Sequence, residues 1–157
     1  MTAAESAAEV APTSADSTEP FSTPASALVG AGPITLTLPP LPPMVRVARL
    51  TASSVASLTD MTIDDIDDIK IAVSEMITVL IQSGGRSLIT LRFEIDADAF
   101  TMDASTPATG LDLGRDDLEL STAVLDAVSD SYEVAFVDDR ILMRISKTPS
   151  SSAPTQA

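Results

Sequence analysis

The sequence predicts an α+β fold, a two-layer sandwich in which about three helices cover one face of a mixed, mostly antiparallel sheet. Short stretches that alternate apolar and polar residues indicate strands, and longer stretches with apolar residues three and four apart indicate helices. The two kinds follow one another in the order strand, helix, helix, strand, strand, helix, strand, strand. Neighbouring strands in this order pair in hairpins, and the helices are then left to cover one face of the sheet.

The predicted strands are short stretches bounded by turn residues. The segment ITLTL, at 34–38, alternates apolar residues with threonine and ends at the proline-rich PPLPP. The segments RSLITLRFEI and AFTMDAS, at 86–95 and 99–105, alternate in the same way on either side of a short acidic turn. The last two strands, 132–137 and 141–145, flank DDR and are expected to form a second hairpin.

Three helices are expected between these strands. The first, at 44–58, has apolar residues at helical spacing and its arginines on the outer side. The second has the strongest pattern, because Thr62 and Asp65 resemble a capping box, and SGG, at 83–85, ends the helix with glycines that can adopt a left-handed conformation. The third is LELSTAVLDAVSD, at 118–130, whose apolar residues lie along one side.

Length and composition indicate one ordinary domain with an aliphatic core. The chain has 157 residues, of which 45% are hydrophobic and only 3% are aromatic. Such a chain is long enough to bury a core built from Ile, Val, Leu, Ala and Met. Residues 1–32 are rich in Ala, Ser, Thr, Glu and Pro, and we expect a disordered acidic tail there. The ordered domain is expected at 33–147, followed by a second disordered tail at 148–157.

Charge and missing residue types exclude several kinds of function. A formal net charge of −14 argues against nucleic acid or an anionic membrane as the main partner. The chain has no Cys and no His, so disulfides, zinc sites and Ser-His-Asp or Cys-His catalysis are excluded, and no metal site is expected. The first residues do not resemble a secretory signal and no stretch is apolar enough to span a bilayer, so the expected location is the cytoplasm.

One carboxylate in the second predicted helix has an unusual setting. Glu75 lies among aliphatic residues, with Ala72 and Val79 three and four residues away on the same face. A charged group rarely occupies an apolar helix face without a reason. Two interpretations are open: a general base, which needs a hydroxyl and a nucleotide within reach, or a carboxylate at the edge of a shallow groove, bonded to water or to an arginine.

The stretch DDIDDIKIAVSEMITVLIQSG, together with LELSTAVLDAVSDSYEV and the order of elements, resembles the anti-sigma-factor serine/threonine kinases of bacteria. These kinases belong to the GHKL (histidine-kinase-like) ATPase superfamily, which has the Bergerat fold. The resemblance covers about residues 34–145 and implies a Bergerat-like domain. The first stretch is similar to the family's N-box helix. The second resembles the segment in which a glycine-rich turn opens a helix that ends just before a strand.

The resemblance implies a role for each matching residue of the second helix. The family's general base, a glutamate that activates a hydroxyl or water, falls on Glu75. The family's asparagine, which holds Mg²⁺ between the nucleotide phosphates, corresponds to Val79, and a histidine one turn later corresponds to Ser83. Because positions four apart share a helix face, Val79 replaces a metal ligand inside the site rather than beside it.

The other nucleotide contacts of the family also differ in this chain. The Asp-x-Gly that reads the adenine amino group corresponds to TPATG, which begins at Thr106 and holds no acid. The Gly-x-Gly whose amides cradle phosphates at a helix N-terminus corresponds to the positions from Glu119 to Ser121, and a glutamate there would repel a triphosphate. The degenerate cofactor-binding positions are therefore Val79, Thr106, Glu119 and Ser121, and of the family's contacts only the vestigial base, Glu75, is retained.

The resemblance implies a regulatory protein of the anti-sigma-factor type, which acts on transcription by protein–protein binding (partner switching) with a largely lost ATP site and no cofactor. Its partner would be a sigma factor, an anti-sigma antagonist protein or a second copy of the chain. The alternative is an active ATP-dependent serine/threonine kinase, with Glu75 as base and with ATP and Mg²⁺ bound through Ser105, Thr106 and the amides of residues 110–121. A third interpretation is a catalytically dead domain with a structural role.

Three further features each have two interpretations. The acidic run from Asp64 to Asp68 fits a solvated helix N-terminus better than a calcium site, since the glycine and distant glutamate of an EF-hand loop are not in place. Gly110 and Gly114 fit a shortened ATP lid or a plain flexible loop. PPLPP, at 39–43, fits a stiff linker better than a ligand of an aromatic-lined groove.

Overall fold

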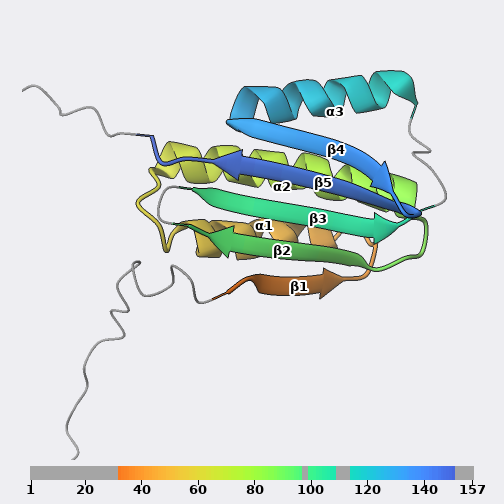
Figure 1. Cartoon of the computed structure of the whole chain (residues 1–157), viewed down its shortest axis with the longest axis horizontal. Coiled ribbons are helices and arrows are strands. Elements are labelled where there is room, and N and C mark those ends of the chain that lie inside the picture. The colour runs from red at the N-terminus through yellow and green to blue at the C-terminus, as the bar shows by residue number, and fades with distance from the viewer. Residues whose placement is uncertain (1–31, 97–98, 109–113, 151–157) are drawn as a thin grey trace, which may run out of the picture.

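The computed structural model describes residues 32–96, 99–108 and 114–150. In these residues the strands and helices follow one another in the predicted order (Figure 1). The elements are β1 (Ile34–Leu38), α1 (Met44–Ala56), α2 (Ile63–Gly84), β2 (Ile89–Ile95), β3 (Phe100–Pro107), α3 (Arg115–Val128), β4 (Ser131–Val137) and β5 (Arg140–Lys147).

The strands form a five-stranded sheet in the order β1-β2-β3-β5-β4. Both predicted hairpins, β2-β3 and β4-β5, are present. The sequence predicted a mixed, mostly antiparallel sheet; every described pairing is antiparallel, and the described residues contain no parallel pair. The strand outside the hairpins, β1, also pairs antiparallel with β2 and places Leu36 opposite Leu91. β5 lies inside the sheet, between β3 and β4.

The described helices form a second layer on one face of the sheet, which confirms the predicted two-layer α+β sandwich (Figure 1). α2 lies between α1 and α3 and contacts both of them as well as β2, β3 and β5. Alternate residues of these strands are fully buried beneath it, as Leu91, Met102 and Met143 show. The core is aliphatic except for Phe93 and Phe100, whose ring centroids are 6.2 Å apart.

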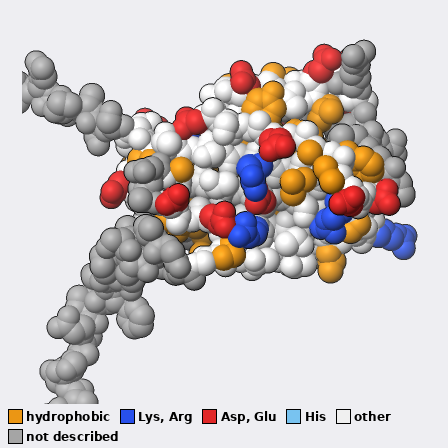
Figure 2. Space-filling model, viewed as in Figure 1, with side chains coloured by type: hydrophobic (Ala, Val, Ile, Leu, Met, Phe, Trp, Pro, Cys, Tyr) orange, Lys and Arg blue, Asp and Glu red, His pale blue; other side chains and the backbone are white. Residues whose placement is uncertain are grey.

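The opposite face of the sheet carries many charged and polar side chains, with apolar ones gathered toward one end (Figure 2). The strands lie in front of the helices in the view of Figures 1 and 2, and the space-filling view shows acidic and basic side chains side by side across this face. Arg144 of β5 donates to both carboxylate oxygens of Asp103 on β3, at 2.5 and 3.0 Å. These hydrogen bonds and the charge of Asp103 raise the pKa of Arg144 above its ordinary value. Arg92 of β2 bridges Asp103 and Glu94. Such a face is suited to contact with water.

Element boundaries differ from the predicted ones where local turns compete with regular structure. α1 ends at Ala56, because the backbone N–H groups of Leu58 and Thr59 form tighter bonds, to carbonyls three residues back. β2 begins at Ile89 rather than at residue 86, since Leu88 lies outside the ladder and is largely exposed. α3 begins at Arg115, earlier than predicted, with two acidic residues in its first turn.

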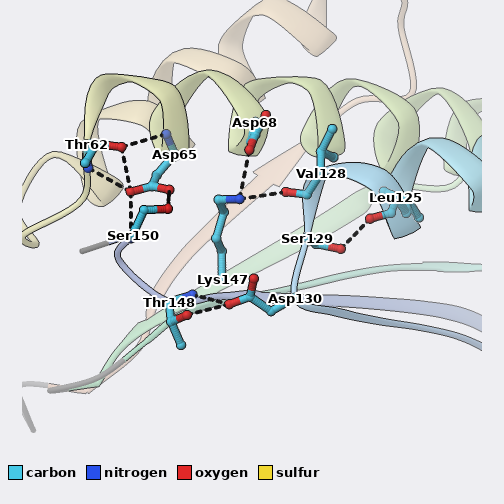
Figure 3. Close-up of polar contacts among 10 residues, drawn as sticks. All are labelled: Thr62, Asp65, Asp68, Leu125, Val128, Ser129, Asp130, Lys147, Thr148 and Ser150. Atoms are coloured by element: carbon cyan, nitrogen blue, oxygen red, sulfur yellow. Dashed lines mark hydrogen bonds and ion pairs between the residues drawn. The ribbon is translucent and has the colours of Figure 1, made fainter. Parts of the chain in front are cut away.

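Hydrogen bonds join the end of the described chain to the start of α2 (Figure 3). The predicted capping box is confirmed, because Thr62 Oγ1 accepts from the backbone N–H of Asp65 and the Asp65 carboxylate accepts from that of Thr62. The same carboxylate accepts from the Ser150 backbone N–H at 3.0 Å and from its hydroxyl at 2.6 Å. Asp130 binds Thr148 in the same way, at 2.7 and 2.6 Å. We call residues 148–150 with their two carboxylates the C-terminal clamp; it extends beyond the predicted domain end at Lys147.

The clamp lowers the pKa of both of its carboxyl groups. Burial alone would raise the pKa of Asp65, but hydrogen bonds from Ser150 and Thr62 outweigh it and hold the pKa well below the ordinary 3.8. Hydrogen bonds from Thr148 lower the pKa of Asp130. A carboxyl group whose pKa is lower in the folded state than in the unfolded state stabilises the folded state at any pH above the unfolded-state pKa. This contribution is lost as the pH falls from the unfolded-state pKa to the folded-state pKa.

Removing the clamp should destabilise the protein, and the effect should depend on pH. A chain that ends at Lys147 should lose about 1–3 kcal/mol of unfolding free energy at pH 7, because the hydrogen bonds to Asp65 and Asp130 are missing. Urea unfolding measures this loss, and a chain that ends at Ser150 is the control, with a stability equal to that of the full chain. The gap between the two variants should narrow as the pH falls below 3.8, because the unfolded chain then binds protons that the clamped carboxylates do not, and it should close only below their depressed pKa values. Equal stability of the two variants at pH 7 would show that the clamp contributes nothing.

Candidate functional site

Helix α2 presents Glu75 toward α3, and its exposed face carries Asp67, Ile71, Thr78 and Gln82. Ile69, Val73, Met76 and Leu80 have at most 1% of their surface exposed and form an apolar stripe with residues three and four apart. Glu75 is half-buried and lies outside this stripe. The helix therefore holds the carboxylate at the boundary between α2 and α3 rather than in the core.

The structure brings two of the predicted site residues together. The Ser121 hydroxyl of α3, which is 8% exposed, donates a hydrogen bond to Glu75 Oε2 at 3.1 Å. These residues lie 46 positions apart in the sequence, and the packing of α3 on α2 makes them neighbours. The bond gives the half-buried carboxylate a partner inside the protein. It is a hydroxyl, where the sequence suggested water or an arginine.

Val79, which stands where the family has its magnesium ligand, is part of the hydrophobic core. Its side chain is 0% exposed and belongs to the same cluster as Met76 and Leu80. Magnesium binds oxygen ligands, and Val79 has none in its side chain. The position next to Glu75 on the helix is thus filled by apolar packing.

Thr106, near the end of β3, packs and forms a hydrogen bond within the fold. Its side chain is fully buried, and its hydroxyl donates to the Leu88 carbonyl at 3.1 Å. It also packs against Gly84, the last residue of α2: a Cβ on Gly84 would lie 2.6 Å from Thr106 Cγ2 and 2.7 Å from Oγ1. The sequence indicated SGG only as the end of a helix. Gly85 does take a positive φ of 60° there, but Gly84 is required by close packing.

The other predicted positions do not join this group. Glu119 is exposed on the first half of α3. Ser83, at the position of the family's histidine, has a buried hydroxyl oxygen without a hydrogen-bond partner in the described residues. Gly114 is the N-cap residue of α3. Gly110 and most of the proposed lid, at 109–113, lie outside the described residues.

The acidic run at the start of α2 serves the fold. Asp65 caps the helix and binds the C-terminal clamp. Asp67 forms an ion pair with Lys70 at 2.7 Å, and Asp68 forms one with Lys147 at 2.8 Å. Over residues 32–96, 99–108 and 114–150, no group of three or more His, Cys, Asp and Glu side chains is arranged to hold a metal ion. These contacts favour the helix N-terminus over the calcium site.

Comparisons with known proteins do not place the chain in a family: no family model matches it, and neither does any curated protein. The resemblance to anti-sigma-factor kinases therefore stays a hypothesis that rests on its residues. None of the helices in the described ranges is long and apolar enough to cross a membrane.

Gly84→Ala should destabilise the protein although alanine favours helices. Thr106 is buried and held by its hydrogen bond, so the new methyl group should cost about 1–3 kcal/mol through overpacking, partly offset by about 1 kcal/mol of helix propensity. Thermal and urea unfolding measure the loss. In a Thr106→Ala background the two closest atoms are gone and only Cβ, at 3.2 Å, remains, so the same change should cost much less. An equal loss in both backgrounds would show that the Gly84–Thr106 contact is not the cause.

Proposed function

We propose that this protein is a regulatory, anti-sigma-factor-like protein that acts by binding other proteins and has lost most of an ancestral ATP site. One observation carries the proposal: the positions that would hold a nucleotide are used for packing within the fold. Val79 is core, Thr106 is buried against Gly84 and Leu88, and Ser121 binds Glu75.

Glu75 illustrates the loss in chemical terms. A general base must reach the hydroxyl of a substrate beside a bound nucleotide. Glu75 instead accepts a hydrogen bond from Ser121, in the segment where the family's phosphate-binding turn would lie. Without an oxygen ligand at Val79 there is no side chain four residues on to hold magnesium. The carboxylate then serves to join two helices.

The active-kinase alternative relied on Ser105 and Thr106 as substitute contacts for ATP. Successive residues of a strand point to opposite faces of a sheet. Thr106 is buried on the helix side, whereas Ser105 is half-buried and accepts a hydrogen bond from Arg140 at 2.9 Å. The two hydroxyls therefore do not line one site, which weakens the alternative.

Binding of a partner needs none of the lost contacts. The partner that the resemblance implies is a sigma factor or an anti-sigma antagonist protein in the cytoplasm, with a homodimer as a further candidate. A net charge of −14 favours a partner with basic surface. Neither nucleic acid nor membrane is part of the proposal. Titration of purified sigma factors and antagonists into the protein tests it, and it fails if none binds.

The first prediction from this proposal concerns nucleotide. Mg-ATP and Mg-ADP should bind no more tightly than about millimolar, which corresponds to roughly −4 kcal/mol. The physical reason is that apolar packing replaces the magnesium ligand at Val79. Isothermal titration calorimetry of the full chain measures it. A micromolar dissociation constant would contradict the prediction, and a titration without Mg²⁺ would show whether a metal is part of any binding.

The second prediction concerns Glu75→Gln. The amide keeps the shape and an oxygen that can accept from Ser121, so unfolding free energy should stay unchanged or rise by up to about 1 kcal/mol, and partner binding should persist. Thermal melts and a radiolabelled phosphotransfer assay on a candidate antagonist measure the two properties. Ser121→Ala is the matched control, because it removes the donor and leaves the carboxylate without its partner. Phosphate transfer by the wild type, reduced about a hundredfold or more in Glu75→Gln, would support the kinase instead.

A further inference from the structure

A groove runs along the outer side of α1, away from the residues discussed so far. It has a volume of about 570 Å³, and Pro42, Pro43, Arg46, Arg49, Leu50 and Lys70 line it. Arg46, Arg49 and Leu50 are spaced three and four residues apart and so share one face of the helix. Leu50 is 58% exposed, which is high for a leucine in an ordered helix. The groove thus combines an apolar floor with positive charge.

The groove gathers a third of the chain's positive charge in a strongly acidic protein. The chain has nine Lys and Arg residues, and Arg46, Arg49 and Lys70 line this one groove. Lys70 pairs with Asp67, as Arg144 pairs with Asp103 and Lys147 with Asp68. Arg46 and Arg49 form no ion pair or hydrogen bond through their side chains in the described part of the chain. Two uncompensated arginines beside an exposed leucine fit an acidic segment that also carries apolar residues.

The N-terminal 31 residues of this chain have that composition. They contain Glu5, Glu9, Asp16 and Glu19 and no Lys or Arg. Apolar residues, including Val10 and Phe21, lie among the acids. Because an extended chain spans about 3.3–3.6 Å per residue, this segment can reach any point of a domain of this size.

Attachment to β1 favours this segment over a free partner of the same chemistry. A segment joined by a flexible linker has an effective concentration in the millimolar range. Individual surface ion pairs contribute little, about 0–1 kcal/mol each. An intrinsic affinity in the millimolar range is therefore enough for partial occupation of the groove.

We propose that residues 1–31 bind the α1 groove within the same molecule, with their carboxylates on Arg46 and Arg49. This inference rests on the groove and on charge complementarity, and it does not depend on the proposed anti-sigma function.

A spin label tests the proposal on the full chain. The chain has no Cys, so Ala8→Cys gives a single labelling position between two of the acidic residues. Paramagnetic relaxation enhancement is then measured on the amide signals of the isotopically labelled protein. Groove amides, such as those of Arg49 and Leu50, should lose about half or more of their intensity, since a millimolar effective concentration populates the bound state substantially. Amides of β4, which is remote from α1, should keep theirs.

Charge variants and a mixed sample complete the test. In the double variant Arg46→Gln/Arg49→Gln, the intensity loss at the groove amides should disappear. The control variant Arg86→Gln/Arg140→Gln removes the same amount of charge elsewhere on the surface, and the intensity loss at the groove amides should remain. Both pairs are exposed, so amide spectra should show folded protein. The proposal is overturned if groove amides are no more affected than those of β4, or if the loss persists without Arg46 and Arg49. It is also overturned if the loss arises only between molecules, in a mixture of spin-labelled and isotopically labelled chains, because the occupant is then a second copy.

Discussion

The need to bury the broad apolar face of helix α2 is the constraint on which the other elements depend. Its residues Ile69, Val73, Met76, Ile77 and Leu80 are at most 1% exposed. The helix contacts α1, α3 and three strands of the sheet. Each fully buried aliphatic side chain contributes about 1.5–3 kcal/mol relative to an exposed one. A helix with this much apolar surface must be covered, and the order of elements along the chain supplies a sheet on one side and a helix on each flank.

Several polar groups on α2 lie where a residue of another element can form a hydrogen bond with them. Each such contact fixes the position of that element relative to α2. Asp65 joins the helix N-terminus to Ser150, and Glu75 joins its middle to Ser121 of α3. Gly84 lets the helix end approach Thr106 of β3. Apolar packing is tolerant of small shifts between elements, whereas hydrogen bonds and close contacts are satisfied in one arrangement only. The aliphatic core thus supplies most of the stability, and these few groups define how the layers are aligned.

The sequence predicted the element order, the hairpins and most of the core because these depend on local periodicity. The capping box at Thr62 and Asp65 was also visible, since its partners lie three residues apart. The clamp was not, because Ser150 lies 85 positions from Asp65 in a segment whose composition suggests a disordered tail. The Glu75–Ser121 bond and the need for Gly84 depend in the same way on packing between distant elements. Arg46 and Arg49 were assigned correctly to the outer side of α1, but only the fold places Lys70 beside them.

The interior position of β5 affects how the chain can fold as it is synthesised. β5 pairs with β3 along Phe100–Pro107 and with β4 along Ser131–Val137, yet it is the last element of the described residues. Until residues 140–147 leave the ribosome, β3 keeps an unpaired edge whose alternate side chains are apolar, and such edges promote association between chains. Contacts between distant parts of a sequence also form slowly. The exposed edge of β3 is therefore open to association with other chains until β5 has been synthesised.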